Sequence, residues 1–432
     1  RPTKVLVKSG VHNRPCYEIT FSDGSTVTCD NVHLWNVTDL SSVGRVQKTY
    51  GTDALFELYT NLVNTGRTRS LVIQNTRALD LPDAALPVDP YLLGVWLGDG
   101  LSKAGQVTIG DEDVEDMVRL IADRWPNVHT AITDARSQRP VHTASLLAPD
   151  PGRCPCGHEP NFNTNGPHRR CRTCEAIQRG TGVRLDDLFE RPAARAEGHC
   201  IYGHKKATGR GECSTCRQAR SSVGGIRFRE VEKINAPFSS GLREIGVLNN
   251  KHIPTRYLRA SSSQRIELLR GLCDTDGYWN PTRGRAEFRT SVQRLAGQVA
   301  SLIDTMGITA GVSTDTDSKT GYVSYKVSFR PLDFVPFHLP RKAGRVETWL
   351  ARRGEGGGTD LRARRRAIVG IAKVPSVPTQ CVSVDAPDSL YLCGERMVPT
   401  HNTGKPPAEA ALDGDDDLAR FDDGATIMYP AK

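Results

Sequence analysis

Two aspartates, Asp99 and Asp276, end two apolar runs that share one pattern. Each run reads Leu-x-Gly-x-x-x-x-Asp-Gly, first over residues 92–100 and again over residues 269–277. Two carboxylates held close together repel each other unless a cation lies between them. Mg²⁺ is commonly held by carboxylates together with water and phosphate oxygens. The pattern therefore predicts a Mg²⁺ site that can polarise a scissile phosphate.

The two runs are long enough for two buried helices, each of which ends at its Asp-Gly pair. An internal repeat of this kind predicts two similar elements that pack against one another. Small residues at a crossing point let helices approach closely, and Gly94 and Gly271 occupy equivalent places in the two runs. Side-by-side packing would bring the two aspartates together at the rim. The alternative is that both helices are core and the aspartates only end them.

The repeated motif resembles the signature of the LAGLIDADG homing endonucleases. Residues 250–258, which lead into the second run, resemble the same segment of endonuclease-bearing inteins. The resemblance implies an αββαββα fold, with two curved sheets over the major groove of DNA and the two aspartates as metal ligands of a double-strand cutter. It also implies a basic residue near each metal site, and Lys326 on the expected strand 325–329 is the candidate.

A cysteine-rich insert, about residues 150–222, separates the two runs and holds seven of the twelve cysteines. Thiolates and an imidazole at this spacing suit tetrahedral Zn²⁺, and four protein ligands make each site structural. Free thiols are the alternative, and Cys156 competes with Cys154 as a ligand. The insert is basic, so it is expected to contact DNA phosphates. The expected ligands are Cys154, His158, Cys171 and Cys174 in one unit and Cys200, His204, Cys213 and Cys216 in the other.

His401, Asn402 and Thr403 form a third group with chemistry of its own. An Asn side-chain amide can attack its own backbone carbonyl, which forms a succinimide and cuts the chain. The preceding His can protonate the leaving group, and the following Thr hydroxyl can accept an acyl group. The sequence therefore predicts a self-cleaving junction between residues 402 and 403.

The segments around this junction resemble the terminal blocks of an intein, whose splicing (Hint) domain is an all-β horseshoe. His33 falls at the position of the intein histidine that activates the upstream scissile amide, although Asp30 replaces the usual Thr three places earlier. Cys381, Trp35 and Thr400 match the three positions that mark class 3 inteins. The resemblance implies attack by Cys381 on the upstream junction, transfer to Thr403 and cyclisation of Asn402. Core packing is the alternative for Trp35, and a buried strand cysteine is the alternative for Cys381.

The chain carries a formal net charge of +8, which is unevenly spread. Residues 403–432 are acidic and the rest of the chain is basic. A basic body is compatible with a polyanionic partner such as DNA. No apolar run is long enough for a membrane span and no secretory pattern opens the chain, so we expect a cytoplasmic protein of a bacterial or phage-infected cell without a membrane partner.

The expected fold class is α+β and multidomain: a discontinuous Hint horseshoe, an inserted αββαββα endonuclease and two zinc units. The expected function is protein splicing combined with Mg²⁺-dependent cleavage of double-stranded DNA at the intein-less host gene, with the host exteins as covalent partners. Compared with inteins, about fifty residues are expected to be missing before residue 1, so the chain alone would not splice. The alternative is a DNA-binding regulator or freestanding endonuclease that has zinc units and no splicing activity. The expected boundaries are 1–86 for the N-terminal splicing part, 87–350 for the endonuclease with the insert 150–222, 351–366 for a linker, 367–402 for the C-terminal splicing part and 403–432 for the start of the host segment.

Overall fold

The computed structural model describes residues 3–42, 45–67, 69–125, 128–132, 141–146, 215–219, 238–332, 334–352 and 363–401. The chain divides into two compact units, residues 1–102 with 249–432 and residues 103–248. Each unit is described by itself. The sequence predicts a division near residue 86, whereas residues 87–102 belong to the same compact unit as the terminal strands.

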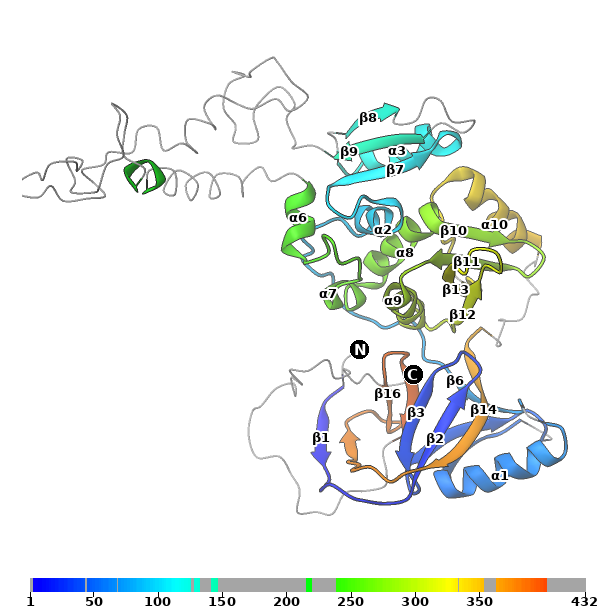
Figure 1. Ribbon diagram of the computed structural model, residues 1–432. Helices are drawn as coiled ribbons and strands as arrows, with labels where there is room; N and C mark the ends of the chain where they lie inside the picture. The colour runs from blue at the N-terminus through cyan, green and yellow to red at the C-terminus, as the bar shows by residue number, and fades with distance from the viewer. Residues whose placement is uncertain are drawn as a thin grey trace, which may run out of the picture. The chain divides into compact units, whose positions relative to one another are not determined.

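The first unit contains an eight-stranded sheet to which both ends of the chain contribute (Figure 1). The strands lie in the order β16, β17, β4, β6, β14, β2 and β3, and β5 pairs with β4. Leu55 and Leu62 of helix α1 (Thr52–Asn64) pack with Trp35 and Ile19 in one core cluster. The strand bounds are β2 (Cys16–Phe21), β3 (Thr26–Asp30), β4 (Leu34–Asp39), β5 (Gln47–Gly51), β6 (Leu71–Gln74), β14 (Arg365–Val374), β16 (Leu390–Cys393) and β17 (Val398–His401).

A second ladder joins the two ends of the chain again. Strand β1 (Val5–Lys8) pairs antiparallel with β15 (Val382–Val384). The segments that the sequence assigns to a split β domain thus pair with each other in two separate places. Strand β14, from the C-terminal segment, joins two strands of the N-terminal segment: it pairs with β2 over one part of its length and with β6 over the other.

The same unit holds a smaller sheet of four antiparallel strands in the order β10, β11, β13 and β12. Helix α9 packs against this sheet, and its buried face includes Leu295 and Val299. The bounds are α7 (Thr255–Leu258), α8 (Ser262–Asp276), β10 (Gly277–Asn280), β11 (Arg285–Thr290), α9 (Gln293–Asp304), β12 (Gly311–Thr316), β13 (Val323–Phe329) and α10 (Pro340–Arg352).

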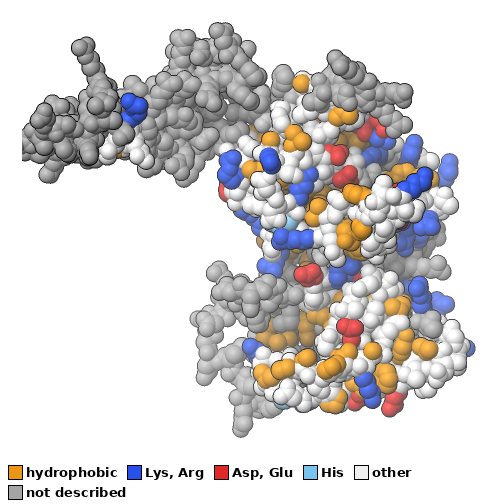
Figure 2. Space-filling model, in the orientation of Figure 1, with side chains coloured by type: hydrophobic (Ala, Val, Ile, Leu, Met, Phe, Trp, Pro, Cys, Tyr) orange, Lys and Arg blue, Asp and Glu red, His pale blue; other side chains and the backbone are white. Residues whose placement is uncertain are grey.

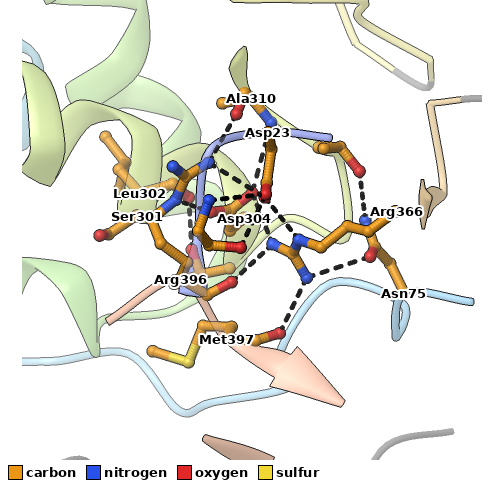
Figure 3. Close-up of polar contacts among 12 residues, drawn as sticks. Asp23, Asn75, Ser301, Leu302, Asp304, Ala310, Arg366, Arg396 and Met397 are labelled. Atoms are coloured by element: carbon orange, nitrogen blue, oxygen red, sulfur yellow. Dashed lines mark hydrogen bonds and ion pairs between the residues drawn. The ribbon is translucent and has the colours of Figure 1, made fainter. Parts of the chain in front are cut away.

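A buried cluster of four charged side chains ties the eight-stranded sheet to the end of α9 (Figure 3). Arg366 of β14 lies 2.6 Å from Asp23 and 3.0 Å from Asp304. Arg396 lies 2.5 Å from Asp304 and 3.5 Å from Asp23. The Arg366, Asp23 and Asp304 side chains are fully buried. Burial opposes ionisation of Asp23, yet Arg366 and Arg396 hold the pKa of Asp23 below its usual value.

The second unit contains a three-stranded antiparallel sheet in the order β7, β9 and β8. Trp125 meets Phe238 of α6 edge to face with ring centroids 5.6 Å apart. None of the helices in the described ranges is long and apolar enough to cross a membrane. The bounds are β7 (Gln106–Gly110), η1 (Asp111–Asp113), α3 (Val114–Ala122), β8 (Val128–Ile132), β9 (Val141–Leu146) and α6 (Phe238–Glu244).

Candidate functional site

The two helices of the repeated motif, α2 (Pro90–Asp99) and α8, cross at their glycines. The Cα atom of Gly271 would lie 3.0 Å from a methyl group placed on Gly94, and the backbone nitrogen of Leu272 would lie 2.8 Å from it. The reciprocal contacts hold for Gly271, whose methyl group would meet Val95 and Gly94. The crossing that the sequence predicts is therefore confirmed. At Gly94 and at Gly271 it leaves no room for a side chain.

Both helices end at the aspartate of their motif. The N–H of Gly100 donates to the carbonyl of Trp96, and the N–H of Gly277 donates to the carbonyl of Cys273. Each terminal glycine then turns into extended backbone. A methyl group on Gly98 would lie 3.4 Å from Oδ2 of Asp276, so the two helix ends are close neighbours.

The surroundings of the two aspartates raise the pKa of both carboxyl groups. Burial and, next, the nearby Asp99 carboxylate raise the pKa of Asp276 to about 6, against the opposing effects of Lys251 and Lys342. Burial likewise raises the pKa of Asp99, again against Lys251 and Lys342. A pair that resists double ionisation is the electrostatic arrangement that a bound cation relieves.

Two lysines lie at the ends of these helices. The Nζ atom of Lys251 donates to the carbonyl of Gly98 over 2.8 Å and lies 5.4 Å from the ring centre of Trp96. The Nζ atom of Lys342, in α10, donates to carbonyls in the last turn of α8. In the sequence, Lys251 comes after α2 and strands β7 to β9, and it contacts the end of α2. Likewise, Lys342 comes after α8 and strands β10 to β13, and it contacts the end of α8.

A cavity of about 520 Å³ opens beside this cluster. Asp276 and Lys251 line it, together with Arg289 of β11 and the exposed Tyr322. Lys and Arg side chains are spread over the face of the molecule drawn in Figure 2. The cavity thus joins the Asp276 carboxylate, which suits a cation, to basic groups that suit a polyanion.

A second group of polar residues lies in the eight-stranded sheet, where His33 precedes β4 and Thr400 lies in β17. The Nε2 atom of His33 is hydrogen-bonded to the hydroxyl of Thr400. Burial lowers the pKa of His33 to about 4, Asp30 opposes this shift, and His401 adds to it. At neutral pH the imidazole is therefore uncharged and can accept a proton.

Trp35 of β4 connects this histidine to the core. The Trp35 ring meets the His33 ring edge to face, with centroids 5.1 Å apart. Its indole N–H donates to the hydroxyl of Thr52 over 3.2 Å, and that hydroxyl donates to the carbonyl of His33 over 3.0 Å. Trp35 is fully buried, so core packing and orientation of His33 are both roles that this geometry permits.

Cys381 stands one residue before β15, where its N–H donates to the hydroxyl of Ser9. Burial is the main cause that raises the pKa of Tyr391, and the charge of a Cys381 thiolate adds to this rise. Tyr391 is the cross-strand partner of Thr400. His401 pairs with Leu390 on one side and with Leu34 on the other. Cys381 therefore lies within electrostatic range of Tyr391, the strand neighbour of Thr400. Asn402 and Thr403 lie outside the described residues.

Residues 263–335 match the family model of the LAGLIDADG-like domain. This part of the chain is therefore similar to that domain, and residues 263–335 are called the LAGLIDADG-like domain after the match. It includes nearly all of α8, the strands β10 to β13 and α9, and therefore the second motif with Asp276.

The chain is 29% identical to the replicative DNA helicase DnaB of Mycobacterium intracellulare over 422 residues, which is 93% of this chain and 53% of that protein. The chain thus spans about half the length of the helicase. A structure of mesophilic variants of the homing endonuclease I-DmoI is similar over 61% of this chain and 97% of that chain, with 13% identity and a TM-score of 0.28. I-DmoI in complex with DNA and Mn is similar over 56% and 89%, with 13% identity and a TM-score of 0.25.

The residues at the end of α8 in the LAGLIDADG-like domain and at the end of α2 fit a divalent cation. Asp276 is partly buried and Asp99 is exposed, and the charge of Asp99 acts on Asp276. The pKa of both carboxyl groups is raised, a shift that a bound cation would reverse. Within the described ranges, no group of three or more His, Cys, Asp and Glu side chains could hold a metal. Mg²⁺ is often held by only one or two carboxylates, with water and phosphate oxygens completing the shell.

Lys326, the basic residue proposed from the sequence, lies on β13 of the LAGLIDADG-like domain opposite Arg289 and Ser313. Lys251 and Lys342 instead act electrostatically on both aspartates. Lys251 lies within the 250–258 segment that resembles endonuclease-bearing inteins, so the signal for it was present. Lys342 belongs to no motif that the sequence reveals.

The zinc prediction falls almost wholly outside the described residues, which include only Cys216 of the eight expected ligands. Cys216 is buried within a short helical stretch, residues 215–219. The other seven, and the competing Cys156, lie outside the described residues, and the two zinc sites stay a prediction.

Proposed function

We propose that the chain is a DNA endonuclease that uses Asp99 and Asp276 to bind a divalent cation and cuts both strands of a duplex. The observation that carries this proposal is the glycine crossing of α2 and α8, which brings two carboxylates of raised pKa together beside a cavity with basic residues. The match of residues 263–335 to the LAGLIDADG-like domain supports it.

In this function Asp99 and Asp276, at the C-terminal ends of α2 and α8, would hold Mg²⁺. When bound, Mg²⁺ supplies positive charge that polarises the scissile phosphate. Lys251 lines the cavity and donates only one described hydrogen bond, so its ammonium group can also meet a phosphate oxygen. Arg289, at the same cavity, can hold the neighbouring phosphate.

The test uses a supercoiled plasmid that carries the host gene without the insert, incubated with Mg²⁺. Asp99→Asn and Asp276→Asn should each lower double-strand cutting by roughly a thousandfold, because each removes one carboxylate from a two-carboxylate site. Both variants should still bind the plasmid. Cutting at the wild-type rate by either variant would remove that aspartate from the site.

We further propose that the eight-stranded sheet carries out protein splicing by the class 3 route. The supporting observation is the partly buried His33, uncharged at neutral pH, which is hydrogen-bonded to Thr400 and packed on Trp35. His33 and Trp35 come from the N-terminal segment and Thr400 from the C-terminal one. The sheet therefore assembles them only when both segments pair.

The proposed splicing steps run as follows. The Cys381 thiol attacks the carbonyl at the upstream junction, forms a thioester and releases the amine, while His33 activates that amide. The Thr403 hydroxyl then takes the acyl group from Cys381 and restores the thiol. The Asn402 amide nitrogen attacks its own carbonyl, which forms a succinimide and frees the Thr403 amine for the final ester-to-amide shift, while His401 assists the cleavage.

The splicing test expresses the whole gene, with its own upstream segment, with and without Cys381→Ala. The wild type should release a ligated host protein, and the variant should accumulate unspliced precursor. Ligated product and branched intermediate from the variant would exclude Cys381 as the nucleophile. Absence of splicing from the wild-type gene would favour the alternative, an endonuclease or DNA-binding regulator whose terminal sheets act only as scaffold.

The similarity to a replicative DNA helicase of Mycobacterium intracellulare extends over nearly the whole chain. We propose that the host protein is a helicase of this kind and that residues 403–432 begin its downstream part. The DNA substrate would then be the uninterrupted helicase gene. Mass spectrometry of the ligated product tests this directly, because the joined peptide must contain helicase sequence on both sides.

A further inference from the structure

The two lysines at the helix ends differ in how many of their donors are already used. An ammonium group has three donors. Lys342 donates to the carbonyls of Cys273, Asp274 and Thr275 over 3.1, 2.6 and 3.2 Å. All three donors of Lys342 are thus spent on the backbone of α8, directly before Asp276. Lys251, by contrast, donates to the single carbonyl of Gly98 among its described bonds and faces the cavity.

Lys342 reaches those carbonyls because α10 begins at a fixed place, and Asp274 fixes it. The carboxylate of Asp274 accepts the backbone N–H of His338 and the backbone N–H of Leu339, each over 3.0 Å. These residues immediately precede α10. The carboxylate also accepts the hydroxyl of Tyr91, on α2, over 2.9 Å. Asp274 is only 2% exposed, so its bonds replace water that it has lost.

Other contacts hold the same loop against α8. The His338 ring bonds to Glu267 over 2.9 Å and meets the Tyr91 ring edge to face. The Arg270 guanidinium donates to the carbonyl of Val335 over 3.0 Å. The start of α10 is thus attached to α8 at several points, and Asp274 is the one attached to the backbone at the helix start.

We propose that Asp274 and Lys342 form one positioning device for the metal ligand Asp276, whereas Lys251 is the lysine that contacts the DNA phosphate. The two contacts form a closed circuit between α8 and α10. Asp274 of α8 anchors the start of α10, and Lys342 of α10 caps the last turn of α8, which carries Asp276. A cation at the C-terminal end of a helix satisfies free carbonyls and stabilises that turn. The inference rests on the proposed endonuclease function, and it gives the two similarly placed lysines different tasks.

The α2 half lacks this device, since Leu97 occupies the place in the first motif that Asp274 occupies in the second. A leucine cannot anchor a loop by accepting backbone N–H groups. The two helix ends are therefore built differently, although their motifs repeat.

The test measures Mn²⁺ binding to the full chain by electron paramagnetic resonance, without DNA, beside Mg²⁺-dependent plasmid cutting. Asp274→Ala and Lys342→Met should each weaken Mn²⁺ binding by about tenfold, a usual size for residues that orient a metal ligand. The double variant should bind no more weakly than either single variant, because both act through one path. Asp274→Asn keeps an oxygen for the two N–H groups, so it should bind Mn²⁺ within about threefold of wild type.

Lys251→Met provides the contrast. It should keep or tighten Mn²⁺ binding, because a positive charge beside the carboxylates is removed, yet lower the cutting rate by about a hundredfold or more. Wild-type Mn²⁺ affinity in Asp274→Ala, or additive losses in the double variant, would overturn the positioning device. Weak Mn²⁺ binding by Lys251→Met would overturn the division of tasks.

The outcome also separates this inference from the proposed function. If the wild type binds Mn²⁺ and the variants behave as expected but no plasmid is cut, the endonuclease proposal fails while the positioning device stands. If the wild type and Asp276→Asn bind Mn²⁺ equally weakly, both fail. Circular dichroism of Asp274→Asn and Asp274→Ala shows whether any loss reflects unfolding.

Discussion

The helix-pair site and the sheet site differ in how they treat charge. At the ends of α2 and α8, Asp276 and Lys251 line a cavity, Lys342 is buried against the backbone of α8, and the pKa of both motif carboxyl groups rises. In the sheet, His33 is partly buried, uncharged at neutral pH and hydrogen-bonded to a neutral hydroxyl. The first arrangement suits an external polyanion and a cation. The second suits proton transfer on the chain's own backbone, where water must be excluded.

The residues that support these sites differ as well. Glycines create the helix-pair site, because the absence of a Cβ lets two backbones touch. Strand pairing between distant segments creates the sheet site, because β17 pairs with β4 across more than 350 residues of chain. The first depends on local sequence, and the second on long-range topology.

The largest effect is expected for Arg366→Met, which removes one cation from the cluster with Asp23 and Asp304. Breaking a buried ion pair on one side leaves charge uncompensated and costs about 3–5 kcal/mol. Because Asp304 ends α9, the loss should destabilise both the sheet and the LAGLIDADG-like domain in a single denaturant transition. Arg119→Met is the matched control, since its pair with Asp116 is exposed and should contribute less than about 0.5 kcal/mol. Equal losses in the two variants would contradict the prediction.

Gly94→Ala should destabilise the helix pair by about 2–3 kcal/mol, because the new methyl group overlaps the backbone of α8. Separation of the helices should also move the aspartates apart and lower plasmid cutting. Gly297→Ala, in α9, is the control: nothing lies within 4 Å of its Cβ position, so it should stabilise the helix by about 0.5–1 kcal/mol. Chemical denaturation measures both, and a neutral Gly94→Ala would refute the tight crossing.

The third prediction concerns pH and only the sheet site. The folded pKa of His33 is about 4 against 6.5 in its ordinary state. Between these values the unfolded chain binds a proton that the folded chain does not, so acid favours unfolding. The free energy of unfolding should therefore fall as the pH falls from 6.5 toward 4, by up to about 1.4 kcal/mol per pH unit, and His33 should contribute no slope above 6.5. His33→Gln should remove this component, and an unchanged slope in that variant would assign it to other groups.

The smallest effect is expected for Thr52→Val, which has nearly the same shape but no hydroxyl. The indole N–H of buried Trp35 then loses its partner, which should cost about 1–2 kcal/mol. If Trp35 serves splicing by orienting His33, this variant should slow splicing of the whole gene as Trp35→Phe does. Normal splicing in Thr52→Val, together with failure in Trp35→Phe, would give the indole a role beyond this hydrogen bond.

The parts that follow from local sequence could be predicted, and those that follow from distant contacts could not. The helix ends at Asp99 and Asp276 and the Gly94–Gly271 crossing are written in a nine-residue pattern. The strand at 16–21, the helix at 293–304 and the strand at 323–329 match alternation or helical spacing in the sequence.

Lys342 could not be predicted, because its partners lie almost seventy residues earlier and its surroundings carry no motif. Helix α1 has no clear start signal in the sequence, because its N-cap is Gly51, which has no side chain to cap the helix. The Asp23–Arg366 ion pair joins residues 343 positions apart. Each is a charged residue of a kind that usually lies on the surface, so neither alone predicts a buried pair.

The buried four-charge cluster also bears on how such an element evolves. Loss of residues 87–350 in one deletion would remove Asp304 and leave Arg366 and Arg396 facing Asp23 alone inside the sheet. Two buried guanidinium groups with a single carboxylate are costly. Removal of this segment would therefore weaken the sheet unless Arg366 or Arg396 changed as well. The cluster thus couples the stability of the eight-stranded sheet to the presence of α9.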